Sequence, residues 1–67
     1  MMYRYYTTQR EPMVGSIPRG AERIVFFDDR IFVDKIARRA WGYAEYKSKL
    51  SDDDISDYEL CEVVIDD

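Results

Sequence analysis

The order of apolar and polar residues at the start of the chain predicts a β-strand. Residues 3–9 read Tyr-Arg-Tyr-Tyr-Thr-Thr-Gln, and aromatic and β-branched residues of this kind are enriched in strands. Successive side chains of a strand point to opposite faces, so two sets are expected. One face carries Tyr3, Tyr5 and Thr7, and the other carries Arg4, Tyr6 and Thr8.

A long loop is expected at residues 10–21, because this stretch holds Pro and Gly residues at close intervals. Its apolar residues Met13, Val14 and Ile17 indicate that the loop packs onto the body of the protein. Two further strands are predicted beyond it, at 22–27 and 30–34.

Asp28-Asp29 lies between these two strands and is predicted to form a tight turn. Asp-Asp is a weaker turn signal than Asn-Gly.

The stretch 33–46 carries two patterns at once. Apolar residues at helical spacing favour a helix: Val33, Ile36, Ala37, Ala40, Trp41 and Ala44. Residues 41–46 contain three aromatic residues and a central Gly, which favours a strand. The interpretation that we prefer is a bend or short helical turn at 35–39 followed by a strand at 40–47, and a partly helical 35–46 stays open.

A short helix is predicted at 52–60. Ser51 and Asp54 form a variant of the capping box, and the run of Asp residues that follows Ser51 suits the positive end of a helix dipole. Residues 61–67 are expected to be a fraying helix end or a short extended tail, in which 63–65 offer an additional edge strand.

Together these elements predict an α+β fold in a single domain, 1–67. The fold is a small antiparallel sheet of about four strands (3–9, 22–27, 30–34 and 40–47), with one C-terminal helix (52–60) packed on one face.

The 67 residues are 46% apolar, and they include no His and only one Cys. Neither an internal disulfide nor a Cys/His zinc site is available, so stability must come from packing, chiefly of the aromatic residues. Trp41 lies beside the small residues Ala40 and Gly42 and is expected to be largely buried. Its expected neighbours are Phe26 or Phe27, Val33 and Ile55.

The single Cys61 favours a cytoplasmic protein, because small secreted domains usually carry paired cysteines. No signal peptide is expected, since the N-terminus lacks an apolar run. The longest stretch without a charge is 12–18, far short of the ~20 residues that span a bilayer, so no membrane association is expected.

Charge is divided unevenly along the chain. Residues 1–50 hold all ten basic residues and six acidic ones, whereas residues 51–67 hold eight acidic residues and no basic one. Halves that differ in this way often indicate an interaction surface. The alternative is internal complementarity, in which the acidic helix neutralises a basic sheet.

The sequence argues against catalysis. General acid–base chemistry usually falls to His, which is absent, and Cys61 has no His to activate it. The two glycines of the loop, Gly15 and Gly20, are not followed by the Lys-Ser/Thr of a phosphate loop, so turn chemistry explains them.

No cofactor or metal site is expected either. The acidic residues of 52–59 lack the Gly of an EF-hand loop, and their role in starting the helix accounts for them.

Single-stranded nucleic acid is one candidate ligand. The first strand interleaves aromatic and cationic residues in the way that single-strand-binding sheets do. The candidate surface comprises Tyr3, Arg4, Tyr6, Arg10 and Arg19. The same tyrosines are equally suited to a core, and the net charge of −4 is opposite to the usual charge of a nucleic-acid-binding domain.

Three blocks of sequence resemble a family of short uncharacterised Firmicutes proteins that are often carried on mobile elements. The blocks are Tyr-Arg-Tyr-Tyr-Thr-Thr-Gln-Arg at 3–10, Ala-Trp-Gly-Tyr-Ala-Glu-Tyr at 40–46 and Asp-Tyr-Glu-Leu at 57–60. Together with a Pro/Gly loop after the first block, Arg39 and Leu50-Ser51, the resemblance covers about half of the chain, which departs from the pattern at 11–14, where Glu11 stands. The resemblance implies a bacterial, cytoplasmic and mobile-element setting, and it implies no activity and no site residue.

These observations predict a non-enzymatic binding module that acts on another macromolecule, with a protein partner favoured over nucleic acid. The expected partner-binding residues are Asp53, Asp57, Glu59 and Glu62. A first alternative is an anti-defence inhibitor of the anti-CRISPR type, whose acidic helix mimics nucleic-acid phosphates. A second alternative is single-strand binding by the Tyr- and Arg-rich sheet.

Overall fold

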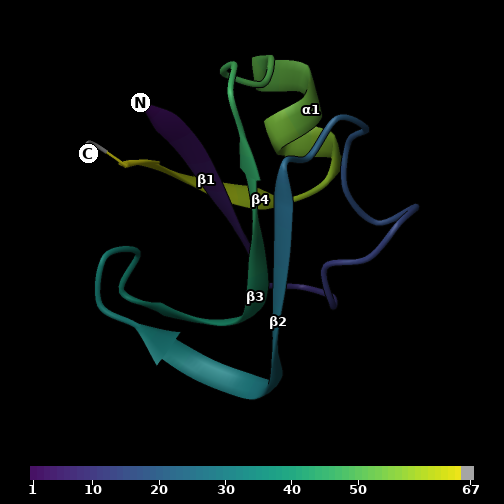
Figure 1. Cartoon of the computed structure of the whole chain (residues 1–67). Coiled ribbons are helices and arrows are strands. Elements are labelled where there is room, and N and C mark those ends of the chain that lie inside the picture. Colours follow the sequence, from purple (N-terminus) through teal and green to yellow (C-terminus); the bar gives the residue numbers. More distant parts are fainter. Residues whose placement is uncertain (66–67) are drawn as a thin grey trace.

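The computed structural model describes residues 1–65, and within them it shows four strands and one helix (Figure 1). They are β1 (Met2–Thr7), β2 (Arg23–Val33), β3 (Arg38–Tyr46), α1 (Asp52–Asp57) and β4 (Leu60–Ile65). The strands form one sheet in the order β2-β3-β1-β4, and every neighbouring pair is antiparallel. The predicted α+β class is therefore confirmed.

One face of the sheet carries the core. The buried cluster consists of Tyr5, Ile17, Ala44, Tyr46 and Leu60, and Tyr3 packs against it. The predicted division of β1 into two faces agrees with this cluster, because Tyr5 belongs to it and Tyr3 packs against it, whereas Tyr6, which is also buried, does neither. The rings of Tyr5 and Tyr46 meet edge to face with their centroids 5.6 Å apart, a favourable geometry for an aromatic pair.

The covering layer over this core consists of the loop that follows β1 and of α1. Ile17 and Ala21 come from the loop, and Ile55 and Tyr58 come from α1 and its C-cap. The Tyr46 hydroxyl donates a hydrogen bond to the Pro18 carbonyl and ties the loop to β3. The loop therefore packs onto the body of the protein, as its apolar residues predict.

The prediction of two strands joined at Asp28-Asp29 is wrong. β2 runs unbroken from Arg23 to Val33, and its register against β3 shifts between Phe26 and Ile31. Asp28 has φ 64°, in the left-handed region that Asp tolerates better than most residues. The two acids therefore form a bulge that bends one strand, and the chain reverses at 34–37 instead.

Several boundaries also differ from the predictions. The first strand ends at Thr7 instead of residue 9, and β3 begins at Arg38, so the helical alternative for 35–46 is wrong. The helix ends at Asp57 instead of residue 60, because Glu59 has φ 54° and turns the chain so that Leu60 pairs with Thr7.

The predicted helix start and the additional edge strand are confirmed. The Ser51 hydroxyl accepts a hydrogen bond from the Asp54 amide at 3.1 Å, as an N-cap does. Residues 60–65 form the edge strand that was expected around 63–65. The rest of the predicted tail, 66–67, lies outside the described residues.

Trp41 is half-buried, so the prediction that it lies largely in the core is wrong. Gly42, Ala44 and Tyr46 alternate onto the core face of β3, which places Trp41 on the opposite face. There the Arg30 guanidinium lies 5.9 Å from the centroid of its ring.

Candidate interaction surfaces

The face of the sheet opposite the core, called the open face below, gathers aromatic side chains around one ion pair. It comprises Arg4, Tyr6, Phe27, Trp41, Tyr43 and Glu45. In Figure 1 α1 and the long loop lie on the other side of the sheet. Phe27, Trp41 and Tyr43 are half-buried, so part of each ring stays accessible.

Cross-strand pairing assembles this face. Arg4 lies opposite Glu45, and Tyr6 lies opposite Tyr43. The Arg4 Nε atom donates to Glu45 Oε2 at 2.9 Å, and the guanidinium carbon lies 4.1 Å from the centroid of the Tyr43 ring. The rings of Tyr6 and Phe27 meet the Tyr43 ring at centroid distances of 5.4 and 5.9 Å. Tyr43 is therefore the hub of the open face.

The Arg4 guanidinium forms an ion pair with Glu45. Burial by itself lowers the pKa of Arg4, but hydrogen bonds to Tyr6 and Glu45 outweigh it, so the pKa lies above its ordinary value. Glu45 is only 8% exposed and shares the pair at 2.7 Å. The guanidinium is therefore committed to a carboxylate within the protein.

The far end of the β2–β3 hairpin, residues 28–40, curls toward the open face (Figure 1). Arg38 donates a hydrogen bond to the Cys61 sulfur at 3.5 Å, and Arg30 donates one to the Thr8 carbonyl at 3.3 Å. The bulge at Asp28 makes this bend. These contacts fix the hairpin end against one border of the open face.

The four acids predicted to bind a partner are all at least partly exposed, but two of them have internal partners. Glu59 pairs with Arg10 at 2.6 Å, and Glu62 pairs with Lys49 at 2.6 Å. Asp53 and Asp57 are exposed on α1, and no ion pair within residues 1–65 includes them.

Glu62 is held on the core side of β4. The hydrogen bond from Lys49 lowers the pKa of Glu62 below its ordinary value, burial opposes the shift, and a hydrogen bond from Tyr5 adds to it. The Tyr5 hydroxyl donates this bond at 2.8 Å. Glu62 therefore supports the fold, which leaves Asp53 and Asp57 as the accessible part of the predicted acidic surface.

The alternative nucleic-acid set is not brought together. Arg4 and Tyr6 share the open face, whereas Tyr3 packs against the core on the other face. Arg10 is paired with Glu59, and Arg19 lies in the long loop. These residues form no continuous surface.

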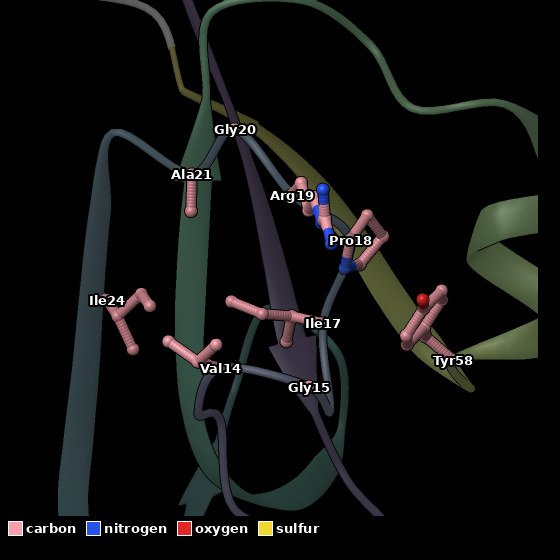
Figure 2. Close-up of a pocket in the computed structure, with 9 residues that line it drawn as sticks. All are labelled: Val14, Gly15, Ile17, Pro18, Arg19, Gly20, Ala21, Ile24 and Tyr58. Carbon is pink, nitrogen blue, oxygen red and sulfur yellow. The ribbon is translucent and has the colours of Figure 1, made fainter.

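The sequence did not predict a hollow of about 400 Å³ between the long loop, β2 and the C-cap of α1 (Figure 2). Its walls are mostly apolar and include Val14, Ile17, Ala21 and Ile24, with Arg19 and Tyr58 as polar members. The apolar residues inside a Pro- and Gly-rich loop were the only signal of it. Gly15 and Gly20 have φ 97° and 95°, so both serve as turn residues, as the sequence indicated.

Neither a cluster of metal ligands nor a membrane-spanning helix occurs in the part of the chain that the structure describes. No three Cys, Asp or Glu side chains there converge in a way that would hold a metal ion. Within the same residues, no helix has the length and apolar character needed to cross a membrane.

Comparison with known proteins places the chain in a family. The sequence profile described as Defence against restriction A C-terminal matches residues 1–64, which include every helix and almost all of the sheet. No curated protein and no solved structure matches the chain. The match also spans all the blocks on which the sequence resemblance rests. With nearly its whole length matched, the chain belongs to the Defence against restriction A C-terminal family and is a module of the anti-restriction type.

Proposed function

We propose that this anti-restriction module is a non-enzymatic binding protein that docks onto another protein through its open face. The observation that carries the proposal is the cluster of half-buried Phe27, Trp41 and Tyr43 around the Arg4–Glu45 pair. Aromatic residues and Arg are enriched in protein interfaces and supply most of their binding hot spots.

The charge of the open face supports a protein partner over nucleic acid. Glu45 neutralises Arg4 within the tyrosine cluster, so this cation is not free to bind a phosphate. The net charge of −4 opposes nucleic-acid binding as well. A protein surface tolerates the pair, because complementary polar groups can meet it.

Several features support binding rather than catalysis. The sequence contains no His, the residue that most often transfers protons in catalysis. The carboxylate of the open face, Glu45, is hydrogen-bonded to Arg4. We propose that the module is encoded on a mobile element and acts in the bacterial cytoplasm, where a defence against restriction would operate.

A second candidate function is inhibition of a defence protein by acidic mimicry, as in anti-CRISPR-like inhibitors. Asp53 and Asp57 favour it, because both are exposed and lie on one face of α1 at i, i+4 spacing. A nucleic-acid-binding groove on a defence protein carries the opposite charge.

The test begins with a pull-down from the native host, followed by mass spectrometry of the captured protein. The affinity of that protein for Tyr43→Ala is then compared with its affinity for Asp53→Lys/Asp57→Lys at two salt concentrations. Asp34→Lys, a charge change on the exposed 34–37 turn, serves as the control. Circular dichroism checks that each variant is folded.

We expect Tyr43→Ala to weaken binding at least tenfold, with little dependence on salt. If Tyr43→Ala binds as the wild type does, the open-face proposal is wrong. Mimicry would be favoured instead if only the Asp53→Lys/Asp57→Lys variant lost affinity and if the wild type bound its partner more tightly at low salt.

A further inference from the structure

The outer edge of β2 is an unusually apolar sheet edge. β2 pairs with β3 on one side, and within residues 1–65 no strand pairs with its other side. Its large apolar side chains are exposed: Ile24 by 41%, Phe26 by 42%, Ile31 by 47% and Phe32 by 56%. A long edge strand of this kind is a template for another strand, and proteins normally protect it with charges or a cover.

The charges along this edge are arranged so that two antiparallel copies of the strand would have complementary charges. Arg23 stands at one end of the segment 23–29, Asp28 and Asp29 stand at the other, and the four residues between them are apolar. No ion pair among the described residues includes any of these three charges. Two antiparallel copies of the segment place Arg23 of each copy opposite Asp28 or Asp29 of the other.

We propose that a second copy of this chain docks on the edge, with β2 pairing antiparallel to β2 around a two-fold axis. The backbone groups of the two edges satisfy each other, and the exposed apolar side chains of 23–27 pack across the junction. The contact is isologous, so the assembly closes as a dimer and leaves no further free edge of this type.

The other edge of the sheet lacks these properties. β4 carries a single charged residue, Glu62, near its middle, and Glu62 is engaged by Lys49 and Tyr5. Two antiparallel copies of β4 therefore lack the opposite charges that two copies of β2 offer each other. An inward-turned charge of this kind protects an edge from pairing.

The dimer extends the proposed binding surface without depending on it. A two-fold axis perpendicular to the sheet keeps the same face of both copies on the same side, so the two open faces join into one surface. Loss of dimerisation and loss of partner binding are separately measurable, because the first is tested by changes at Arg23, Asp28 and Asp29 and the second by a change at Tyr43.

The test measures the solution mass of the full chain by light scattering and sedimentation at several micromolar concentrations. We expect twice the chain mass of 8.0 kDa for the wild type. Arg23→Asp and Asp28→Asn/Asp29→Arg should each give half of the wild-type mass, because like charges then oppose each other in both halves of the contact. Asn is used at 28 because it tolerates the left-handed conformation of that residue.

Charge complementation makes the test specific. A mixture of the two variants should form a one-to-one heterodimer, and combining all three changes in one chain should restore the homodimer. Val64→Lys, at an exposed position of β4, is the matched control and should leave the dimer intact. Circular dichroism should show every variant folded.

Three results would overturn the proposal. The first is a wild-type chain that stays monomeric throughout the concentration range. The second is a dimer that persists in Arg23→Asp, and the third is a mixture of folded variants that fails to associate.

Discussion

Gly42 is the position where a single methyl group should do the most damage. A Cβ atom at this residue would lie 2.1 Å from the Val25 carbonyl oxygen and 2.7 Å from the Pro12 side chain. The carbonyl belongs to the neighbouring strand, so it cannot retreat without opening the β2–β3 ladder. Gly42 therefore lets the strands and the long loop approach one another closely.

The expected size follows from two opposing effects. Replacing Gly by Ala at an unstrained position stabilises a protein by about 0.4–1 kcal/mol, because the unfolded chain loses freedom. Overpacking costs about 1–3 kcal/mol and sometimes more. The contact with backbone at Gly42 puts the cost at the upper end of that range, so we expect a net loss of about 2–3 kcal/mol.

Such a loss is large for this chain. A domain of this size has a total stability of roughly 3–10 kcal/mol, at about 0.05–0.15 kcal/mol per residue. The Tm of a small domain falls by roughly 4–8 °C for each kcal/mol, so Gly42→Ala should melt about 8–24 °C below the wild type.

Urea and thermal unfolding followed by circular dichroism measure this change. Gly15→Ala and Gly20→Ala are the controls, because no atom beyond the adjacent residues lies within 4 Å of a Cβ at either position. Their cost comes only from the left-handed backbone, about 1–2 kcal/mol. A Gly42→Ala midpoint equal to or above that of the wild type would refute the close approach.

Three further predictions follow from single contacts. Ser51→Ala removes the N-cap acceptor of α1 and should cost about 0.5–2 kcal/mol, visible as a lower urea midpoint; an unchanged midpoint would contradict the cap. The pKa of Glu62 lies below its ordinary value of 4.5 in the folded state, so its contribution to stability is present above that pH and is lost as the pH falls through the folded pKa. In Glu62→Gln, the free energy of unfolding should therefore fall less as the pH is lowered than it does in the wild type. The same pH dependence in both proteins would argue against the shift of the Glu62 pKa. Burial raises the pKa of Tyr5 and Tyr46 to about 12, so their neutral forms stabilise the fold fully below pH 10 and this stability is lost between about pH 10 and 12. Absorbance titration of tyrosinate should show a fraction of the tyrosines ionising only near pH 12, and titration of all six together near pH 10 would contradict it.

Local patterns were enough to predict the class of the fold and several of its parts. Alternation along residues 3–7 separates Tyr5 from Tyr6 on opposite faces, because the period of a strand is a local property. The cap at Ser51 is equally local, since the hydroxyl and the Asp54 amide are three residues apart.

The errors concern features that depend on distant residues. Asp28-Asp29 has the composition of a turn, and only the pairing of β2 with β3 on both sides of it shows that it is a bulge. Trp41 is the kind of large apolar residue that usually lies in a core. The long loop, however, covers the face of β3 to which Gly42 belongs, and Trp41 lies on the opposite face.

The contacts within the candidate surfaces depend on distant residues as well. Glu59 and Glu62 were expected to face a partner, yet Arg10 and Lys49 pair with them across 49 and 13 residues of chain. The hub at Tyr43 requires both β1 and β2 to lie beside β3. Residue spacing alone contains no signal for either arrangement.

The central place of β1 has a consequence for how the chain folds as it is synthesised. β1 is synthesised before both of its neighbours in the sheet, which begin only at Arg38 and Leu60. Its pairing must close two long loops, whereas β2 and β3 are joined by a four-residue turn.

We expect the β2–β3 hairpin to form early and β4 to complete the sheet last. In pulse-labelled hydrogen exchange during refolding, the amides shared by β2 and β3 should gain protection before those shared by β1 and β4, and the reverse order would contradict this. The Tyr-rich strand β1 thus lacks its second neighbour until β4, more than fifty residues later in the chain, has been synthesised.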